Sequence, residues 1–521
     1  MIREAFPKPA IAILLLAVAI RVYGASVAST INIDGTLYIN QAKALYYGQG
    51  QELFCGLNFI PLNSLLLVPL YFVTRNWLVA GQTLSLACGV GSIIPIYLIS
   101  RRFFEERIST AVLLLLSLIP VLVNSSIEII KDPVAWVLFS CGLLCFIRHM
   151  EQRARADILL CSLFFLSAGW ARAEFLLLYF ATALYILFSQ PSHRIRDLLL
   201  FLAPLGLIAL IAFVFPGISG ISTGHIRTPG AFVPQATAHI DNPYTALKTQ
   251  LFALADTYPP NEGPLQNFLP EAANLAWLVG LGMIATRACE AIFHPFAIFF
   301  LVGFWSIGHW THDQKIHYLL WITGVSFLLL YLQTLQTWIL EPRWLGGMIL
   351  CATIFAGIGI QKTDLFLQKK CKMTKRTSII AICVFLLLFG LAKNIKHHNE
   401  DNAVYKEIAS AIERDSDQQP TIFAGSASTK APLYLVSFYA NLTKPKAICP
   451  ADNLILTEED LNSPATLAKE LAAHDIHYVL LAPAPPGSKH PLPLQELTAL
   501  SLCLGEWHHK DLGSLFLYKI K

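Results

Sequence analysis

The chain has 521 residues, of which 55% are hydrophobic and only 14% are charged, and its mean hydropathy is +0.55. Soluble globular domains carry about 25% charged residues, so this composition excludes a disordered chain, a small disulfide-rich protein and an ordinary cytosolic enzyme. The net charge of +4 is too small to indicate a nucleic-acid-binding protein. The apolar residues occur in long blocks, which is typical of a polytopic membrane protein.

Eleven apolar segments approach the roughly 20 residues that a helix needs to cross a bilayer. They lie at 9–27, 77–100, 108–123, 133–148, 157–170, 174–190, 198–215, 291–309, 317–338, 344–361 and 377–392. Lys and Arg concentrate in alternate loops, above all at 362–376, and such loops face the cytoplasm. The sequence therefore predicts a mainly α-helical membrane bundle of about 11 transmembrane helices, with its N-terminus inside and its C-terminus outside. Residues 272–289 are interpreted as an interfacial helix, because a further span there would place the basic 362–376 loop outside.

Two external segments are expected to shape a cavity at the membrane surface. The loop after the first span contains two amphipathic stretches, 34–47 and 60–74, which are typical of helices that lie in the membrane interface. Residues 216–272 are rich in Gly, Pro, Thr and Asn and show little periodicity. We therefore expect a long loop there, of a length that is usually functional or disordered.

Residues 393–521 have the polarity of an ordinary soluble domain. Helical signals alternate with short strand-like runs at 402–414, 421–424, 458–474, 478–481 and 515–518. The sequence therefore predicts two domains, a membrane domain at 1–392 and a small exported α/β domain at 393–521. Cys449 and Cys503 both lie in the exported part, so a disulfide between them is possible in an oxidising compartment.

Charged side chains at a membrane boundary cost free energy and usually serve a function. On the predicted external side they are Asp34, Glu128, Lys131, Asp132, Arg172, Glu174, Glu341 and Arg343. Each also has a structural explanation. Asp34 and Asp132 stand where a helix N-cap is expected, Arg172 and Glu174 could pair with each other, and Arg343 could be a snorkelling membrane anchor. Together they predict a site for an anionic lipid substrate.

Several short motifs follow one another along the membrane domain. They are Asp34 with Tyr38, Ala42 and Gly48; Ile60-Pro61-Leu62; Arg101-Arg102-Phe103-Phe104; Asp132-Pro133; Gly169-Trp170-Ala171-Arg172-Ala173-Glu174; and Pro342-Arg343-Trp344. Their order and the predicted topology resemble those of the GT-C superfamily of polytopic glycosyltransferases. More narrowly, they resemble the group of protein O-mannosyltransferases and lipid A aminoarabinose transferases. The resemblance covers roughly residues 1–361.

The motifs also depart from the pattern of that group. Gly35 follows Asp34, where the first motif of the family often has a second acidic residue. Ala173 and Phe175 replace a Pro and a Gly of the family, and Trp344 replaces a Tyr. The first departure leaves metal binding open.

The resemblance implies a glycosyltransferase of the inner or plasma membrane, with its active site facing the periplasm or exterior. Its donor would be a hexose or pentose on polyprenyl phosphate, which an acceptor hydroxyl displaces with inversion. Asp34 is expected to be the catalytic base, while Asp132, or alternatively Glu128, orients the acceptor or holds a cation. Arg343 first, then Lys131 and Arg172, are expected to bind the phosphate.

Glu174 and Tyr38 complete the expected substrate-binding residues. No metal ligands are assigned, although a divalent cation is possible as a cofactor. The acceptor could be a protein, a lipopolysaccharide, a lipid or a cell-wall glycan, and the expected partners include membrane lipids but no nucleic acid.

Two other classes of function compete with this reading. A transporter or flippase for lipid-linked glycans would predict inverted repeats and broken helices at the middle of the bilayer. The sequence shows no such symmetry, and its candidate charges lie at the outer rim. A non-catalytic envelope assembly factor would tolerate the replacement of Asp34 and Arg343.

Overall fold

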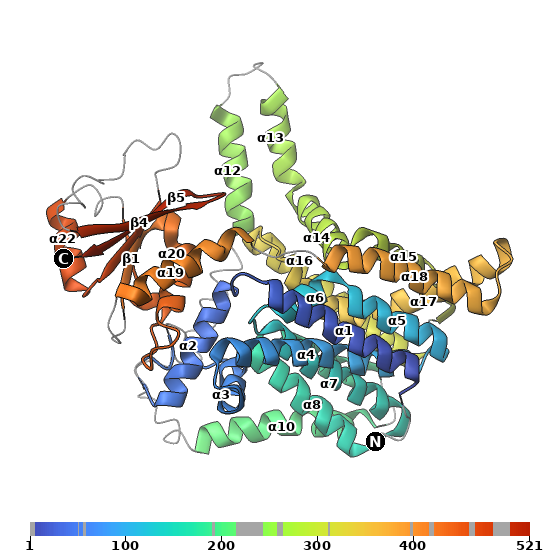
Figure 1. Cartoon of the computed structure of the whole chain (residues 1–521). Helices are drawn as coiled ribbons and strands as arrows, with labels where there is room; N and C mark the ends of the chain where they lie inside the picture. Colours follow the sequence, from blue (N-terminus) through green and yellow to red (C-terminus); the bar gives the residue numbers. More distant parts are fainter. Residues whose placement is uncertain are drawn as a thin grey trace. The chain divides into compact units, whose positions relative to one another are not determined.

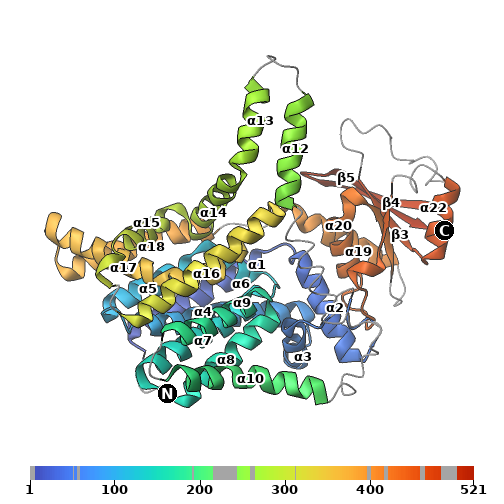
Figure 2. The same ribbon diagram turned by 180° about the vertical axis from the view of Figure 1, so that it is seen from behind.

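The structure is a computed structural model, and it describes residues 6–50, 52–55, 59–189, 193–214, 243–257, 264–310, 313–395, 400–415, 421–457, 464–482 and 501–520. Most of these residues are helical, and a small sheet lies near the C-terminus (Figures 1 and 2). The chain forms two compact units, which are described separately. The helical unit comprises Met1–Arg21, Leu86–Ser126 and Lys131–Ile395, and the mixed unit comprises Val22–Ser85, Ile127–Ile130 and Lys396–Lys521.

The helical unit contains most of the apolar helices. They are α5 (Glu106–Leu118), α6 (Pro120–Ile127), α7 (Asp132–Gln152), α8 (Arg155–Ala171), α9 (Glu174–Ser189), α10 (Arg194–Val214), α12 (Pro243–Thr257), α13 (Pro264–Asn274), α14 (Ala276–Ile292), α15 (His294–Trp305), α16 (Gln314–Thr337), α17 (Gly346–Lys370) and α18 (Lys375–Asn394), with the 3₁₀ turns η1 (Ile307–Trp310) and η2 (Pro342–Leu345). Unit boundaries fall within α1 (Lys8–Val27), within α4 (Trp77–Ser100) and before the last residue of α6.

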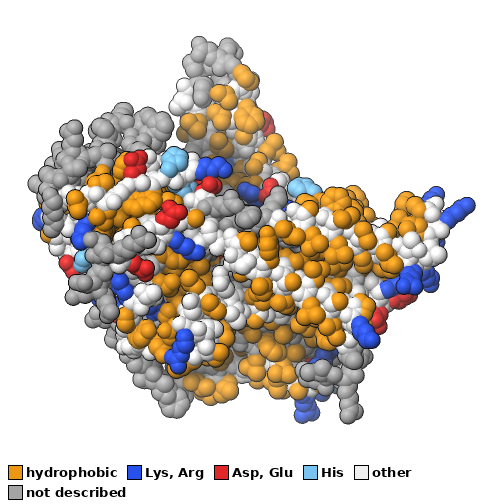
Figure 3. Space-filling model, viewed as in Figure 1, with side chains coloured by type: hydrophobic (Ala, Val, Ile, Leu, Met, Phe, Trp, Pro, Cys, Tyr) orange, Lys and Arg blue, Asp and Glu red, His pale blue; other side chains and the backbone are white. Residues whose placement is uncertain are grey.

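Many of these helices have the length and composition of membrane spans. Within the described residues, six helices pass that test, or eight if each of two bent helix pairs counts as one span. A membrane protein with a mainly helical fold is therefore confirmed, whereas the predicted number of eleven spans is not established by this test. Figure 3 shows apolar side chains over the broad face of α1 and α5, and Lys and Arg side chains near the end of α17.

The third predicted span is broken into two helices. α5 and α6 meet at Pro120 with a bend of 51°. A proline has no amide hydrogen to donate, so carbonyl groups beside the break need other partners when no water is near. The buried Arg21 donates to the carbonyl of Ser117 at 3.3 Å, and Asn394 Nδ2 donates to the carbonyl of Leu118 at 2.9 Å. The arginine that interrupts the first apolar segment thus stabilises the break in another helix.

α15 and α17 pack against each other with their backbones in close contact. A Cβ atom on Gly303 would lie 1.7 Å from the carbonyl oxygen of Phe355, and one on Gly359 would lie 1.8 Å from that of Phe299. Small residues are typical of helix interfaces in membranes because they allow this approach. Both glycines are therefore required by the helix pair.

The prediction of a long loop at 216–272 was wrong for part of that segment. Two helices, α12 and α13, lie side by side there (Figure 1). Both begin with a proline, Pro243 and Pro264, which suits the first turn of a helix because that turn needs no amide donor. The remaining residues of the predicted loop, 216–242 and 258–263, lie outside the described residues.

The mixed unit combines two helices of the first external loop with the C-terminal sheet. Its elements are α2 (Ile33–Tyr47), α3 (Leu62–Thr74), η3 (Glu400–Asn402), α19 (Ala403–Asp415), β1 (Phe423–Ser426), η4 (Ala427–Thr429), α20 (Lys430–Ala440), η5 (Pro450–Asp452), β2 (Leu454–Leu456), α22 (Pro464–Ala473), β3 (Tyr478–Leu481), β4 (Ser501–His509) and β5 (Gly513–Ile520). The predicted α/β character of the C-terminal region is confirmed.

The sheet has the strand order β2-β1-β3-β5-β4. β1 pairs in parallel with β2 and β3, whereas β5 is antiparallel to β3 and β4. Apolar side chains such as Ala424, Leu471, Val479 and Tyr518 form a core between the sheet and α22. The sequence predicted β1, β3, β5, α19 and α22, but it missed β2, β4 and α20.

The predicted pairing of Cys449 with Cys503 is wrong. Cys449 forms a disulfide with Cys55 of the first external loop, with the two Cα atoms 5.0 Å apart. Cys503 is an exposed free cysteine on β4. The true partner lies 394 residues away along the chain, and only the packing of the first loop against the C-terminal region brings the two thiols together.

Candidate active site

The first turn of α7 carries the most deeply buried carboxylate of the candidate site. Asp132 is only 1% exposed and is the first residue of the helix, followed by Pro133. The preceding Lys131 occupies the N-cap and makes no side-chain cap hydrogen bond. The prediction that Asp132 caps this helix is therefore wrong, because its carboxylate turns to an arginine instead.

That arginine is Arg172, which lies in the two-residue break between α8 and α9. Its guanidinium pairs with Asp132 and also with Glu174, whose Oε1 lies 2.8 Å from its Nη2. The predicted pair between Arg172 and Glu174 is confirmed, and the structure adds the bond to Asp132. A buried carboxylate needs a partner of this kind, since an unpaired charge there is very unfavourable.

Two further cations lie within electrostatic range of Asp132. They are Lys131, which also acts on Glu174, and Arg343. Arg343 lies in the 3₁₀ turn before α17 and pairs with Glu341. The structure thus brings together five of the predicted site residues, Lys131, Asp132, Arg172, Glu174 and Arg343, which we call the charged cluster.

A glycine explains how α17 approaches this cluster. A Cβ atom on Gly346, at the start of α17, would lie 2.1 Å from the indole ring of Trp136. Trp136 is one helical turn beyond Asp132 on α7 and is almost fully buried. The glycine therefore lets the start of α17, and with it Arg343, lie against the first turns of α7.

A mostly apolar pocket opens beside the cluster. Its lining is formed by Trp136, Arg172, Glu174, Phe175, Leu178, Ser326, Leu329, Leu330, Gln333, Trp344, Gly347 and Met348. The hydroxyl of Ser326 is buried without a hydrogen-bond partner within the described part of the chain. An apolar pocket with an arginine among its lining residues has the chemistry to bind an anionic lipid.

The remaining predicted residues lie in the mixed unit, at the N-terminus of α2. Asn32 caps this helix, because its Oδ1 accepts a hydrogen bond of 3.0 Å from the amide of Asp34. Asn32 Nδ2 also donates to Oε2 of Glu128 at 2.9 Å. The prediction that Asp34 is the cap is therefore wrong: Asp34 lies in the first turn, where the helix dipole favours a negative charge.

Tyr38 and Gly35 are neighbours of Asp34 on α2, and the packing of this helix explains the glycine. Tyr38 follows Asp34 by four residues, hence lies on the same side of the helix, and is buried. A Cβ atom on Gly35 would lie 2.9 Å from the carbonyl oxygen of Ile129. The acidic residue that often stands here in the GT-C group would meet this backbone, so the packing of α2 accounts for the glycine.

Sequence reasoning missed three groups of the candidate site. Asn32 is one of them, although Asn is among the best N-cap residues. Trp136 and Ser326 were hidden inside apolar segments, where the lone serine of a hydrophobic helix was the available signal. Across the described residues, no group of three or more His, Cys, Asp and Glu side chains is arranged to hold a metal ion.

Comparisons with known proteins relate this geometry to a fold. A family model described as dolichyl-phosphate-mannose-protein mannosyltransferase matches residues 70–217. A comparison with curated protein sequences finds no match.

Three solved structures share the fold of this chain. ArnT from Cupriavidus metallidurans bound to undecaprenyl phosphate is 12% identical with a TM-score of 0.57, over 98% of this chain and 97% of that chain. Its apo structure has the same identity and a TM-score of 0.56, over 97% of both chains. The Archaeoglobus fulgidus oligosaccharyltransferase in complex with Zn and sulfate is also 12% identical with a TM-score of 0.56, over 98% of this chain and 73% of that chain. The chain thus has the fold of ArnT and of this oligosaccharyltransferase, and its residues 70–217 are similar to the mannosyltransferase family model.

Proposed function

We propose that this protein is a glycosyltransferase that moves a sugar from a polyprenyl-phosphate donor to an acceptor hydroxyl, with inversion at the anomeric carbon. The observation that carries the proposal is the apolar pocket lined by Arg172, beside a cluster that also holds Arg343 and Lys131. The polyprenyl phosphate in the structure of ArnT supports the same donor chemistry. No observation favours a flippase or an assembly factor.

The proposed topology has eleven spans, a cytoplasmic N-terminus and an exported domain that begins near residue 393. In support of it, each predicted span overlaps at least one helix: α1, α4, α5 with α6, α7, α8, α9, α10, α15, α16, α17 and α18, of which α9 and α15 are short. In this topology the protein lies in the inner or plasma membrane, and the candidate residues face the periplasm or exterior.

The proposed reaction is a single displacement. The acceptor oxygen forms a bond to the anomeric carbon while the bond from that carbon to the phosphate oxygen breaks, which releases polyprenyl phosphate. The carboxylate of Asp34 takes the proton of the acceptor hydroxyl, and such general-base help contributes about 10²–10⁴-fold to the rate. Tyr38 and Glu128 are proposed to contribute to substrate binding from the same unit.

The charged cluster is proposed to stabilise the leaving group. Negative charge grows on the phosphate as the glycosidic bond breaks, and fixed cations stabilise it best in a site from which water is excluded. Arg343 is the first candidate for this role, because a guanidinium binds two phosphate oxygens at once. Asp132 and Glu174 hold Arg172 in place through the observed ion pairs. A divalent cation would be an addition to this scheme, for which no ligand set is assigned.

Single-turnover transfer from labelled polyprenyl-phosphate sugars in proteoliposomes tests this function. The wild-type protein is expected to consume donor when a range of acceptor hydroxyls is offered, whereas Asp34→Asn binds donor with unchanged affinity and turns it over about 100-fold more slowly. Asp313→Asn is the matched control, since Asp313 caps α16 and belongs to neither group of candidate residues. Equal turnover by wild type and Asp34→Asn would refute the role of Asp34. No turnover by wild type would refute the proposed function.

A further inference from the structure

Helix α2, which carries Asp34, is attached along its whole length to the C-terminal part of the mixed unit. Beyond both ends of the helix, the amide of Ile31 donates to the hydroxyl of Tyr439 at 2.9 Å, and Cys55 is bonded to Cys449. Between them, Asn40 Nδ2 donates to the carbonyl of Ile448 at 2.6 Å.

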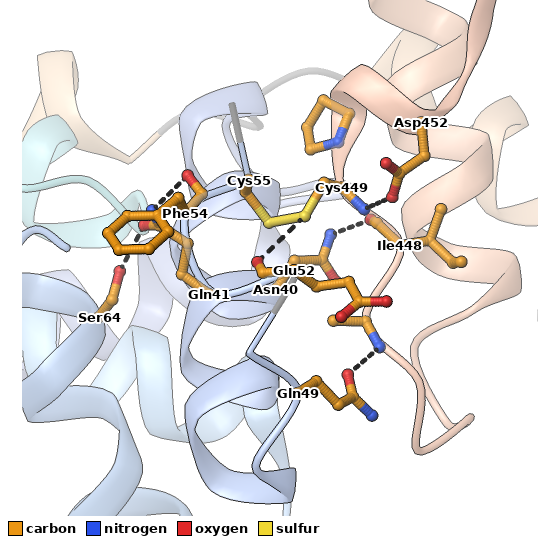
Figure 4. Close-up of a disulfide and its surroundings, with 12 residues drawn as sticks. Asn40, Gln41, Gln49, Glu52, Phe54, Cys55, Ser64, Ile448, Cys449 and Asp452 are labelled. Atoms are coloured by element: carbon orange, nitrogen blue, oxygen red, sulfur yellow. Dashed lines mark hydrogen bonds between the residues drawn. A yellow bond between two sulfur atoms is a disulfide. The ribbon is translucent and has the colours of Figure 1, made fainter. Parts of the chain in front are cut away.

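The loop after α2 continues these attachments. Gln49 Nε2 donates to the carbonyl of Pro445 at 3.2 Å, while its Oε1 accepts from the amide of Ala447 at 2.9 Å. Figure 4 shows the disulfide, the bond from Asn40 and the bond to Gln49 side by side, all reaching the same segment of the C-terminal region.

The central attachment is a buried lysine. Lys43 is 1% exposed, and its Nζ donates to the carbonyl of Asn441 at 2.9 Å and to that of Leu442 at 3.4 Å. Asn441 is the C-cap of α20, where helix carbonyls lack partners within the helix and favour a cation. Lys43, in the middle of α2, thus donates hydrogen bonds to carbonyl groups at the C-terminal end of α20.

The receiving segment is itself fixed within the sheet. The side chain of Asn441 accepts from the amide of Thr421 at 2.9 Å and donates to the carbonyl of the same residue at 2.9 Å. Thr421 leads into β1. The position of α2 is therefore tied to the sheet through Lys43 and Asn441 as well as through the disulfide.

We propose that the exported domain positions α2 for catalysis, with Lys43 and the disulfide between Cys55 and Cys449 as its positioning groups. The catalytic part of this inference rests on the proposed function, since it assumes that Asp34 is the base. The exported domain then acts as a structural part of the active site instead of a separate binding module. A displacement of about 1 Å in a reacting group can cost about 100-fold in rate, so even a small movement of α2 would be visible in turnover.

Two sets of variants test the proposal in the full-length protein in proteoliposomes. Lys43→Met and the pair Cys55→Ser with Cys449→Ser each remove one attachment. Their matched controls are Lys430→Met, an exposed lysine at the start of α20, and Cys503→Ser, an exposed free thiol on β4. Backbone hydrogen exchange of residues 33–47 and single-turnover kinetics are measured on all of them.

Both test variants are expected to exchange the amides of α2 about 10-fold faster than wild type, while the amides of α7 and α17 exchange as before. The rate of the chemical step falls by about 10- to 100-fold while the donor KM changes little, because the charged cluster holds the donor phosphate in this scheme. Both controls behave as wild type.

If the amides of α2 exchange at the wild-type rate in both test variants, the positioning role is overturned. Faster exchange without a slower chemical step would overturn its catalytic part. If wild type itself consumes no donor, the proposed function fails, and the exchange arm still decides whether the exported domain holds α2.

Discussion

Arg172, in the break between α8 and α9, forms an ion pair with Asp132 in the first turn of α7, forty residues earlier in the chain. Both side chains are buried, and Glu174 shares the same guanidinium. The bond joins two helix ends that the sequence separates by a complete helical hairpin, and Arg172 and Glu174 also line the apolar pocket.

Removal of this arginine is expected to destabilise the protein strongly. Arg172→Met leaves the carboxylate of Asp132 buried without its partner, which typically costs about 3–5 kcal/mol. The double variant with Asp132→Asn should recover part of that loss, because it removes the uncompensated charge. Thermal unfolding of both variants in detergent measures the difference, and a double variant less stable than the single one would contradict the interpretation.

Replacement of Arg343 is expected to affect catalysis more than stability. Arg343→Ala should slow the chemical step about 10²–10³-fold, because a fixed cation is lost from the leaving phosphate. Arg343→Lys should recover only part of the rate, since an ammonium cannot bind two phosphate oxygens in the same plane. Arg287→Ala, an exposed arginine on α14, is the control for both in single-turnover assays.

The contact between α15 and α17 predicts a sharp difference between two glycines. Gly303→Ala should destabilise the protein by about 1–3 kcal/mol, because the new Cβ meets a backbone carbonyl that cannot rotate away. Gly282→Ala on α14 should be neutral or slightly stabilising, since open space surrounds that position. The melting temperatures of the two variants are compared by thermal unfolding. Equal values would mean that α15 and α17 can move apart to accommodate the new methyl group.

Lys43 predicts a rise in stability at alkaline pH. Burial, assisted by the nearby Lys444, lowers the pKa of Lys43 from 10.5 to about 8. Below pH 8 Lys43 is protonated in both the folded and the unfolded protein. The free energy of unfolding is then reduced by the full cost of burying its charge. Between pH 8 and 10.5 the folded protein releases a proton that the unfolded chain keeps, so this group adds up to about 1.4 kcal/mol per pH unit to the free energy of unfolding.

The comparison of wild type with Lys43→Met isolates this contribution. The difference in free energy of unfolding between the two proteins should change in favour of wild type as the pH rises from 8 to 10. A difference that stays constant over this range would show that the pKa of Lys43 is not lowered in the folded state.

The sequence predicted those features that depend on neighbouring residues. Long apolar runs located the helices of the membrane bundle. The charged cluster was also predicted residue by residue, because a charge at the edge of an apolar segment stands out. Arg172 and Glu174 were even paired correctly from their spacing.

Features that depend on distant packing could not be predicted. The amide group of Asn32, which caps α2, also donates to Glu128, a residue 96 positions further along the chain. The break at Pro120 is stabilised by Arg21, and nothing in the sequence connects the two. Strand β4 was missed because its burial pattern is irregular and its register shifts once against β5.

The disulfide between Cys55 and Cys449 also orders the steps by which the protein matures. Ribosomes deliver α2 long before α20, and 394 residues separate the two cysteines. In the proposed topology, the bond can close only after the later cysteine has crossed the membrane and met an oxidant. A newly inserted chain therefore passes through a stage in which its membrane helices are in place but α2 is still unanchored. On the proposed function, such an unfinished molecule could not yet act on the donor lipids around it.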